Sequence, residues 1–163
     1  MSLAESFLSE FDDEMKNTRR ILERVPAEKW DWKPHAKSRS LGELATHVGE
    51  LPRWGVRLKG ESFQVGSEKA PVMKSAPELV ARLESNAAAA RESLSGMSEA
   101  DLEGQFRVLK PDGSVFFQLP RRAVPRSVLM NHLIHHRGQL TVYLRLLDVP
   151  LPTIYGPTAD EGI

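Results

Sequence analysis

The sequence predicts an all-α protein built as a four-helix bundle, with a small β-hairpin or extended loop before the last helix. Three observations lead to this prediction. Apolar residues recur at intervals of three and four over four separate segments. Two of these segments begin with strong helix-start signals, and loops rich in proline and polar residues separate them. Four amphipathic helices of this kind bury their apolar faces against one another in a bundle.

The first helix is expected over residues 3–24, where Phe11 and Met15 lie on the apolar stripe. Residues 30–37 are too rich in turn-forming residues to continue it and are expected to form a loop. The second helix should begin after Ser40, because Ser40 and Glu43 have the spacing of a capping box, in which each satisfies a free amide at the helix start.

Pro52 lies within the apolar pattern of this second helix and removes one backbone hydrogen bond, so a kink or an early end is expected there. The third helix should begin at Ser75, which is followed by Pro77 and Glu78 as in many helix starts. Its alanine run at 87–90 should let a neighbouring helix approach closely.

Alternating apolar and polar residues flank the turn at residues 111–113, which predicts a small β-hairpin or an extended loop. The last helix should run from Pro125 to about Asp148 and is apolar almost all round, so we expect it to lie centrally in the core or in an oligomer contact. The tail that follows should pack back on the bundle as an extended arm.

Composition limits the class of protein. The size, with 40% hydrophobic and 27% charged residues, predicts a single domain over residues 1–163. The balance of 22 basic and 22 acidic residues gives no reason to expect nucleic acid or an anionic membrane as a partner. Without cysteine, the chain has no disulfide, thiolate ligand or cysteine nucleophile. An acidic N-terminus and the absence of a long apolar run predict a cytoplasmic protein.

Three of the five histidines lie between Asn131 and Gln139. His132 and His136 are four residues apart, so on a helix they project from one face and can share a divalent cation. His47 replaces an apolar residue on the core-facing stripe of the second helix. The sequence therefore predicts a metal site formed by His47, His132 and His136. The alternative is that they are ordinary buried histidines, hydrogen-bonded to carbonyl groups.

Gln139 and Tyr143 continue the helix face of His136 and are the candidate catalytic residues, since they can orient water or substrate. The alternative is that both are polar groups satisfied by local hydrogen bonds. Arg137 should point elsewhere, toward a carboxylate or a helix end.

Other polar residues near the histidines are weaker candidates. We expect His135 not to be a metal ligand and His35 to be exposed in its loop. Glu43 and Glu50 are near enough to His47 along the helix to support its ring, but solvated surface positions are expected for both.

Three imidazole ligands suit zinc, nickel, copper or iron, and zinc or nickel is expected. An open fourth position lets the metal activate water for hydrolysis, or a thiol for transfer to a small electrophilic substrate. In a cysteine-free chain that thiol would be a low-molecular-weight cosubstrate. The prediction is a metal-dependent hydrolase or thiol S-transferase, and the alternative is a non-catalytic metal-binding or dimerising bundle.

Several motifs occur in a familiar order: Ser40-Leu-Gly-Glu-Leu before His47, then His132-Leu-Ile-His-His-Arg-Gly-Gln139, and finally Pro152-Thr-Ile-Tyr-Gly-Pro-Thr-Ala-Asp160. Together they resemble the DinB family, part of the DinB/YfiT-like metalloenzyme superfamily. The resemblance implies an up-down-down-up bundle with one divalent metal held by the three histidines, usually in a homodimer. It also implies chemistry with thiols such as bacillithiol or mycothiol, or metal-dependent hydrolysis.

Overall fold

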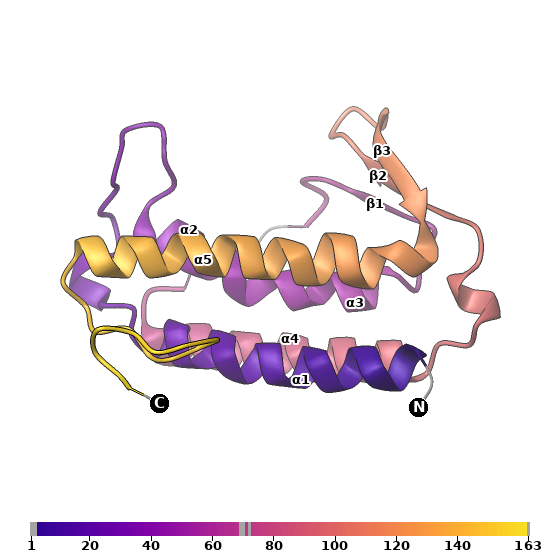
Figure 1. The fold of residues 1–163 in the computed structure, drawn as a ribbon. Coiled ribbons are helices and arrows are strands. Elements are labelled where there is room, and N and C mark those ends of the chain that lie inside the picture. Colours follow the sequence, from indigo (N-terminus) through magenta and orange to yellow (C-terminus); the bar gives the residue numbers. More distant parts are fainter. Residues whose placement is uncertain (1–2, 69–70, 72, 163) are drawn as a thin grey trace.

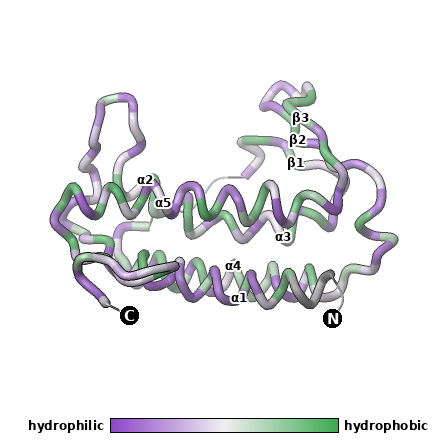
Figure 2. The backbone as a smooth tube through the Cα atoms, in the orientation of Figure 1, coloured by the Kyte–Doolittle hydropathy of each residue, from purple (hydrophilic) through white to green (hydrophobic). Residues whose placement is uncertain are grey.

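The computed structural model describes residues 3–68, 71 and 73–162. Its long helices form two layers, with α5 and α2 in one and α1 and α4 in the other (Figure 1). The α-helices are α1 (Leu3–Leu22), α2 (Leu41–Glu50), α3 (Trp54–Arg57), α4 (Ala76–Ser95) and α5 (Asn131–Leu146). Apolar and polar residues recur in turn along each helix (Figure 2), which is the pattern expected of helices that bury one side. Among the described residues, no helix combines the length and the apolar character that a membrane span requires.

The helix-start signals are confirmed. The Ser40 hydroxyl accepts a hydrogen bond from the Glu43 backbone N–H at 3.2 Å, and the Glu43 carboxylate accepts one from the Ser40 N–H at 2.7 Å. The Ser75 side chain accepts from the Glu78 N–H in the same way at the start of α4. These caps satisfy amide groups that the first helical turn leaves free.

The expected break at Pro52 is also confirmed. A 3-10 turn over Leu51–Arg53 separates α2 from the short α3. Beyond the break, a Cβ atom added to Gly55 would lie 2.8 Å from the Cβ of Ala90. The small residues of α4 therefore allow the close helix contact that the alanine run predicts.

The prediction of an all-α fold is wrong, because the chain also contains a three-stranded mixed sheet. β2 (Gln105–Leu109) and β3 (Val115–Pro120) form an antiparallel hairpin, which was one of the two predicted alternatives. β1 (Ser62–Gln64) pairs parallel to β2, and this strand was not predicted. A three-residue strand is too short to show an alternating pattern, and its pairing depends on where the chain returns in space.

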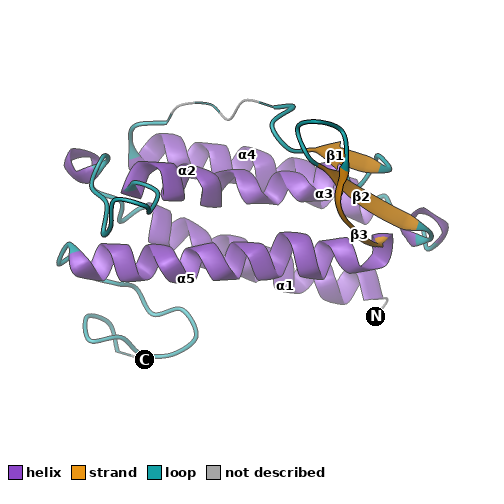
Figure 3. Ribbon diagram, turned by 90° about the horizontal axis from the view of Figure 1, so that it is seen from above, coloured by secondary structure: helices purple, strands orange, loops and turns teal. Residues whose placement is uncertain are grey.

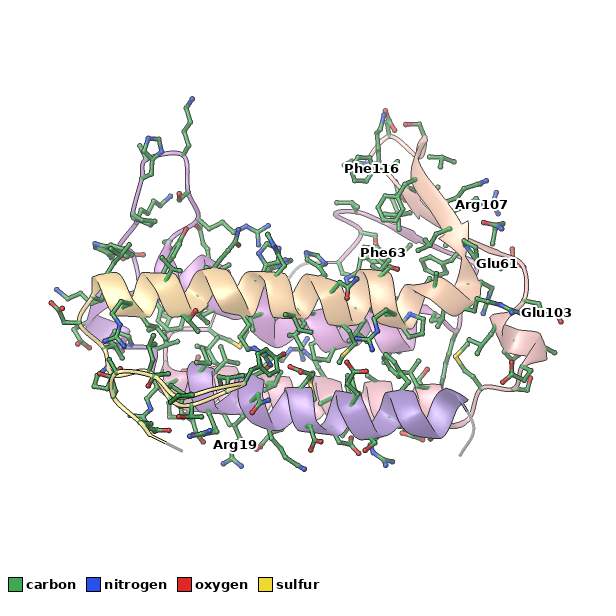
Figure 4. All side chains as sticks on the ribbon, viewed as in Figure 1. Arg19, Glu61, Phe63, Glu103, Arg107 and Phe116 are labelled. Carbon is green, nitrogen blue, oxygen red and sulfur yellow. The ribbon has the colours of Figure 1, made fainter. Side chains whose placement is uncertain are left out.

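The sheet lies at one end of the helical layers, on the side of α2 and α5, and the loop before α2 rises on the same side at the other end (Figures 1 and 3). Figure 4 shows Phe63 between the sheet and the helices and Phe116 farther out on the hairpin. The sheet and this loop thus lie at opposite ends of the seam between α2 and α5.

The last helix is less buried than its composition predicts. It begins as a π-helical segment, Pro125–Met130, and continues as α5. Leu133, Leu140 and Leu144 are fully buried in the core, but Val142 and Leu146 are 58% and 59% exposed. In the single chain, two apolar side chains near the end of α5 therefore face water.

A buried ion pair joins α5 to α1. The Arg137 guanidinium, only 3% exposed, lies 2.6 Å from the Glu14 carboxylate and donates to the Glu14 carbonyl and the Thr18 hydroxyl. The Tyr155 hydroxyl donates to the same carboxylate at 2.6 Å. Arg137 thus points toward a carboxylate, as one of its two predicted alternatives required.

The tail packs back on the bundle, as predicted for the extended arm. Besides Tyr155, its Glu161 forms ion pairs with Arg20 at 2.6 Å and with Arg24 at 3.1 Å, both on or just after α1. The tail therefore covers the outer side of the contact between α1 and α5.

We expect Glu14→Ala to lower the free energy of unfolding by about 3–5 kcal/mol, because it leaves the Arg137 charge buried without its partner. The matched control is Glu10→Ala, which removes an exposed ion pair with Arg126 and should cost no more than about 1 kcal/mol. Urea unfolding of both variants measures the difference. Equal losses would contradict the role given to the buried pair.

Candidate metal centre

Three imidazole rings meet at the seam between α2 and α5. His47 projects from α2, and His132 and His136 project from successive turns of α5. The Nε2 atoms of His47 and His132 are 3.3 Å apart. One ring nitrogen from each histidine can be chosen so that all three lie within 4.8 Å of one another. All three side chains are partly buried.

This geometry fits a shared cation. Two nitrogens bound tetrahedrally at about 2.0–2.1 Å from one zinc ion lie about 3.4 Å apart, close to the 3.3 Å between His47 and His132. Among the described residues, no carboxylate joins the three histidines within the same distance limit. The donor set is therefore three imidazoles, which can hold a divalent first-row metal and leave a coordination position for another molecule.

The rings are in the protonation state that a metal requires. Burial is the main cause that lowers the pKa of His47 from 6.5 to about 3, and the nearby charge of Arg39 acts in the same direction. Burial also lowers the pKa of His132 to about 4 and, less strongly, that of His136. At pH 7 the three imidazoles are neutral and their lone pairs are available.

Of the two candidate catalytic residues, Gln139 contacts a histidine of the cluster, whereas Tyr143 packs against the loop before α2. The Gln139 side-chain oxygen is 2.7 Å from Nδ1 of His136, so Nδ1 is the donor and Nε2 of that ring carries the lone pair. The Tyr143 ring packs edge-on against Trp32, with ring centroids 5.7 Å apart. Its hydroxyl lies 3.4 Å from the Arg39 carbonyl oxygen.

The weaker candidates lie outside the cluster. His35 is exposed, as expected, and His135 is exposed as well. Glu43 is also exposed and is engaged by the capping box. The expectation for Glu50 is wrong, because it is 8% exposed and bound by Arg82, Arg53 and Asn86 from neighbouring segments. Its burial depends on side chains that arrive from α4, which helix periodicity does not show.

Two hollows open on either side of the histidines. The hollow on the loop side has a volume of about 460 Å³ and includes Trp30, Arg39 and His47 in its lining. The hollow on the sheet side has a volume of about 400 Å³ and reaches His132. Both fall in the range of small-molecule sites. His47 thus borders the first hollow and His132 the second.

Sequence reasoning did not identify Arg39, Trp54 or Phe117 as residues of this region. Trp54 and Phe117 line the sheet-side hollow, and Arg39 lines the loop-side hollow. Trp54 belongs to the apolar pattern that continues the second predicted helix, and Phe117 to the alternating pattern after the turn at residues 111–113, and both patterns describe local structure alone. For Arg39 the sequence offers one signal. It directly precedes Ser40, the N-cap of α2, so it must lie close to the start of the helix that carries His47.

The structure thus defines a mainly helical protein with a three-histidine cluster at a helix seam. The DinB family model matches residues 1–162, and the chain belongs to the DinB family. The Bacillus subtilis protein YrdA, described as uncharacterized, is 25% identical over 161 residues, which cover 95% of this chain and 89% of that protein.

Two solved structures show the same fold. A DinB-like protein from Bacillus cereus has a TM-score of 0.72 and 24% identity, covering 93% of this chain and 97% of that one. A DinB-like protein from Bacillus subtilis has a TM-score of 0.67 and 21% identity, covering 91% and 96%. The family predicted from the sequence motifs is confirmed by the family model.

We expect the metal-free protein to lose stability as the pH falls from about 6.5 toward 5. The unfolded chain takes up protons on His47 and His132 near pH 6.5, whereas the folded chain resists until about pH 3–4, so acid favours unfolding. Urea unfolding in the presence of a chelator measures this slope. A His47→Gln/His132→Gln variant should have a flatter profile over the same interval, and an unchanged slope would contradict the assignment.

Proposed function

We propose that this chain is a metal-dependent enzyme in which His47, His132 and His136 hold one divalent cation, most simply zinc or nickel. The observation that carries this proposal is the convergence of three neutral imidazoles from two helices, with 3.3 Å between two of their nitrogens. When bound, the metal would supply a Lewis-acid centre that lowers the pKa of a water molecule or of a thiol.

The protein's own groups have distinct roles in this proposal. Gln139 accepts from Nδ1–H of His136 and holds that ring with Nε2 available as a ligand. In this proposal Tyr143, whose ring packs against Trp32 and whose hydroxyl lies 3.4 Å from the Arg39 carbonyl oxygen, would orient water or substrate that enters past this loop. The two hollows beside the histidines have the volume for a small-molecule substrate and, where one is used, a thiol cosubstrate.

Two reaction types fit this arrangement. One is hydrolysis of a small electrophilic substrate by activated water. The other is S-transfer from a low-molecular-weight thiol, which must come from outside because the chain has no cysteine. Thiol-consumption assays with several electrophiles, run beside ester and amide hydrolysis assays on the same metal-loaded sample, separate the two. We propose a cytoplasmic location and no nucleic-acid partner, in line with the balanced charge.

We expect protein purified without chelator to contain about one divalent metal per chain, as measured by elemental analysis. His136→Ala should lose most of this metal, because two imidazoles hold a first-row cation much less tightly than three.

The matched control for this experiment is His135→Ala. It removes an exposed imidazole from the same helix, one residue away, and should leave the metal content unchanged. Metal content that is low in the parent protein and identical in both variants would refute the proposed metal site. Circular dichroism of each variant verifies that the fold is kept.

A second candidate function is a non-catalytic dimerising bundle, and the exposed apolar face of α5 favours it. Val142 and Leu146 are four residues apart, hence on one face, and both are more than half exposed. We propose that a second copy of the chain covers this face, in a homodimer that is compatible with either function.

We expect sedimentation at micromolar concentration to give a dimer for the parent protein and a monomer for Leu146→Glu, because the introduced charge would be buried in the contact. The control is Thr141→Glu, which adds a charge on α5 away from the pair. A monomeric parent protein, or a Leu146→Glu variant that stays dimeric, would refute this interface.

A further inference from the structure

The sheet-side hollow is lined almost entirely by apolar side chains and ends at a histidine of the cluster. Phe116 and Phe117 of β3 are 62% and 39% exposed, which is unusual for phenylalanine in water. The lining consists of Trp54, Val65, Val108, Phe116, Phe117, Leu119, Ser127, Val128 and His132. An apolar group seated here would cover exposed aromatic surface and place its attached atoms next to the candidate metal centre.

The floor of this hollow is rigid. Trp54 packs edge-on against Phe63 and Phe106, with ring centroids 5.1 and 6.5 Å apart. Val108 and Val128 are 2% and 8% exposed and belong to the core. The shape is therefore formed before a ligand arrives, which reduces the entropy lost on binding.

A cationic side chain, Arg39, lies in the loop-side hollow. The exposed Arg39 side chain has no hydrogen-bond or ion-pair partner among the residues that the structure describes. It lines the same hollow as His47, whose Nε2 atom is 3.3 Å from that of His132, the histidine that the sheet-side hollow reaches. The carboxylates that line the same hollow are already engaged, Glu43 by the capping box and Glu50 by Arg82.

We propose that the ligand of this site is a small amphiphilic organic anion, whose carboxylate pairs with Arg39 and whose apolar chain or ring fills the hollow beside His132. Arginine suits this role because its planar guanidinium matches a carboxylate. The inference rests on the proposed function in one respect: for such a ligand to be a substrate, the bond that reacts would have to lie next to the three histidines. It narrows the proposed substrate class from any small electrophile to one that carries both a carboxylate and an apolar chain or ring.

The test uses 4-phenylbutanoate as the probe, which has an aromatic ring and a carboxylate. Acetate lacks the ring, and 4-phenylbutan-1-ol lacks the charge. Calorimetry, with tryptophan fluorescence as a second signal, measures binding to the zinc-loaded and the metal-free protein. We expect 4-phenylbutanoate to bind at least about tenfold more tightly than either control compound, since burial of about 60 Å² of apolar surface already corresponds to tenfold.

Variants test each contact separately. Arg39→Gln should weaken 4-phenylbutanoate about tenfold and leave 4-phenylbutan-1-ol unchanged. Phe117→Ala should weaken both aromatic compounds and leave acetate unchanged. The controls are Arg122→Gln, which removes an exposed charge elsewhere, and Val115→Ala, which removes exposed apolar surface of β3 outside the hollow.

The outcomes separate this inference from the proposed function. If the metal is absent but the metal-free protein still discriminates the three compounds through Arg39 and Phe117, the metal proposal fails and the ligand class stands. If the metal is bound but 4-phenylbutanoate binds no better than acetate, or Arg39→Gln has no more effect than Arg122→Gln, the ligand class is overturned.

Discussion

The buried ion pair between Arg137 and Glu14 is the constraint on which the site depends. Arg137 directly follows His136 in the chain, and successive residues of a helix point about 100° apart. Because the guanidinium is held 2.6 Å from a carboxylate of α1, α5 can take only one rotation about its axis. In that rotation His132 and His136 face the seam with α2. A charge that must be buried with its partner thus orients two imidazoles that make no contact with it.

The partner helix is placed by local devices that act together. The capping box at Ser40 fixes the start of α2, and the 3-10 turn at Pro52 ends it one turn after His47. Trp30 packs so closely over Gly42 that an added Cβ atom would lie 2.0 Å from its ring nitrogen, which ties the preceding loop to the helix. The same loop carries Arg39, so the element that positions His47 also brings a positive charge to the cluster.

The proposed binding would account for several features of the seam. Neutral imidazoles are kept close together in a partly buried place, and an arginine lies beside them without a partner among the described residues. Phenylalanine side chains of β3 are open to water on the other side. A folded domain selected for stability alone would pair the charge and cover the rings. The cation and the amphiphilic anion proposed above would use these features.

The sequence by itself determined the local structure and the identity of the cluster. Capping residues, Pro52 and the hairpin turn act within a few residues, so their effects can be read in order along the chain, and the one-turn spacing of His132 and His136 is a property of any helix. Tertiary structure alone decided the rest. The parallel pairing of β1 with β2, the burial of Glu50 by Arg82, and the meeting of Arg39, Phe117 and the histidines around one seam join residues far apart in the chain. Such contacts depend on how helices and sheet pack in three dimensions, and neither periodicity nor spacing records that packing.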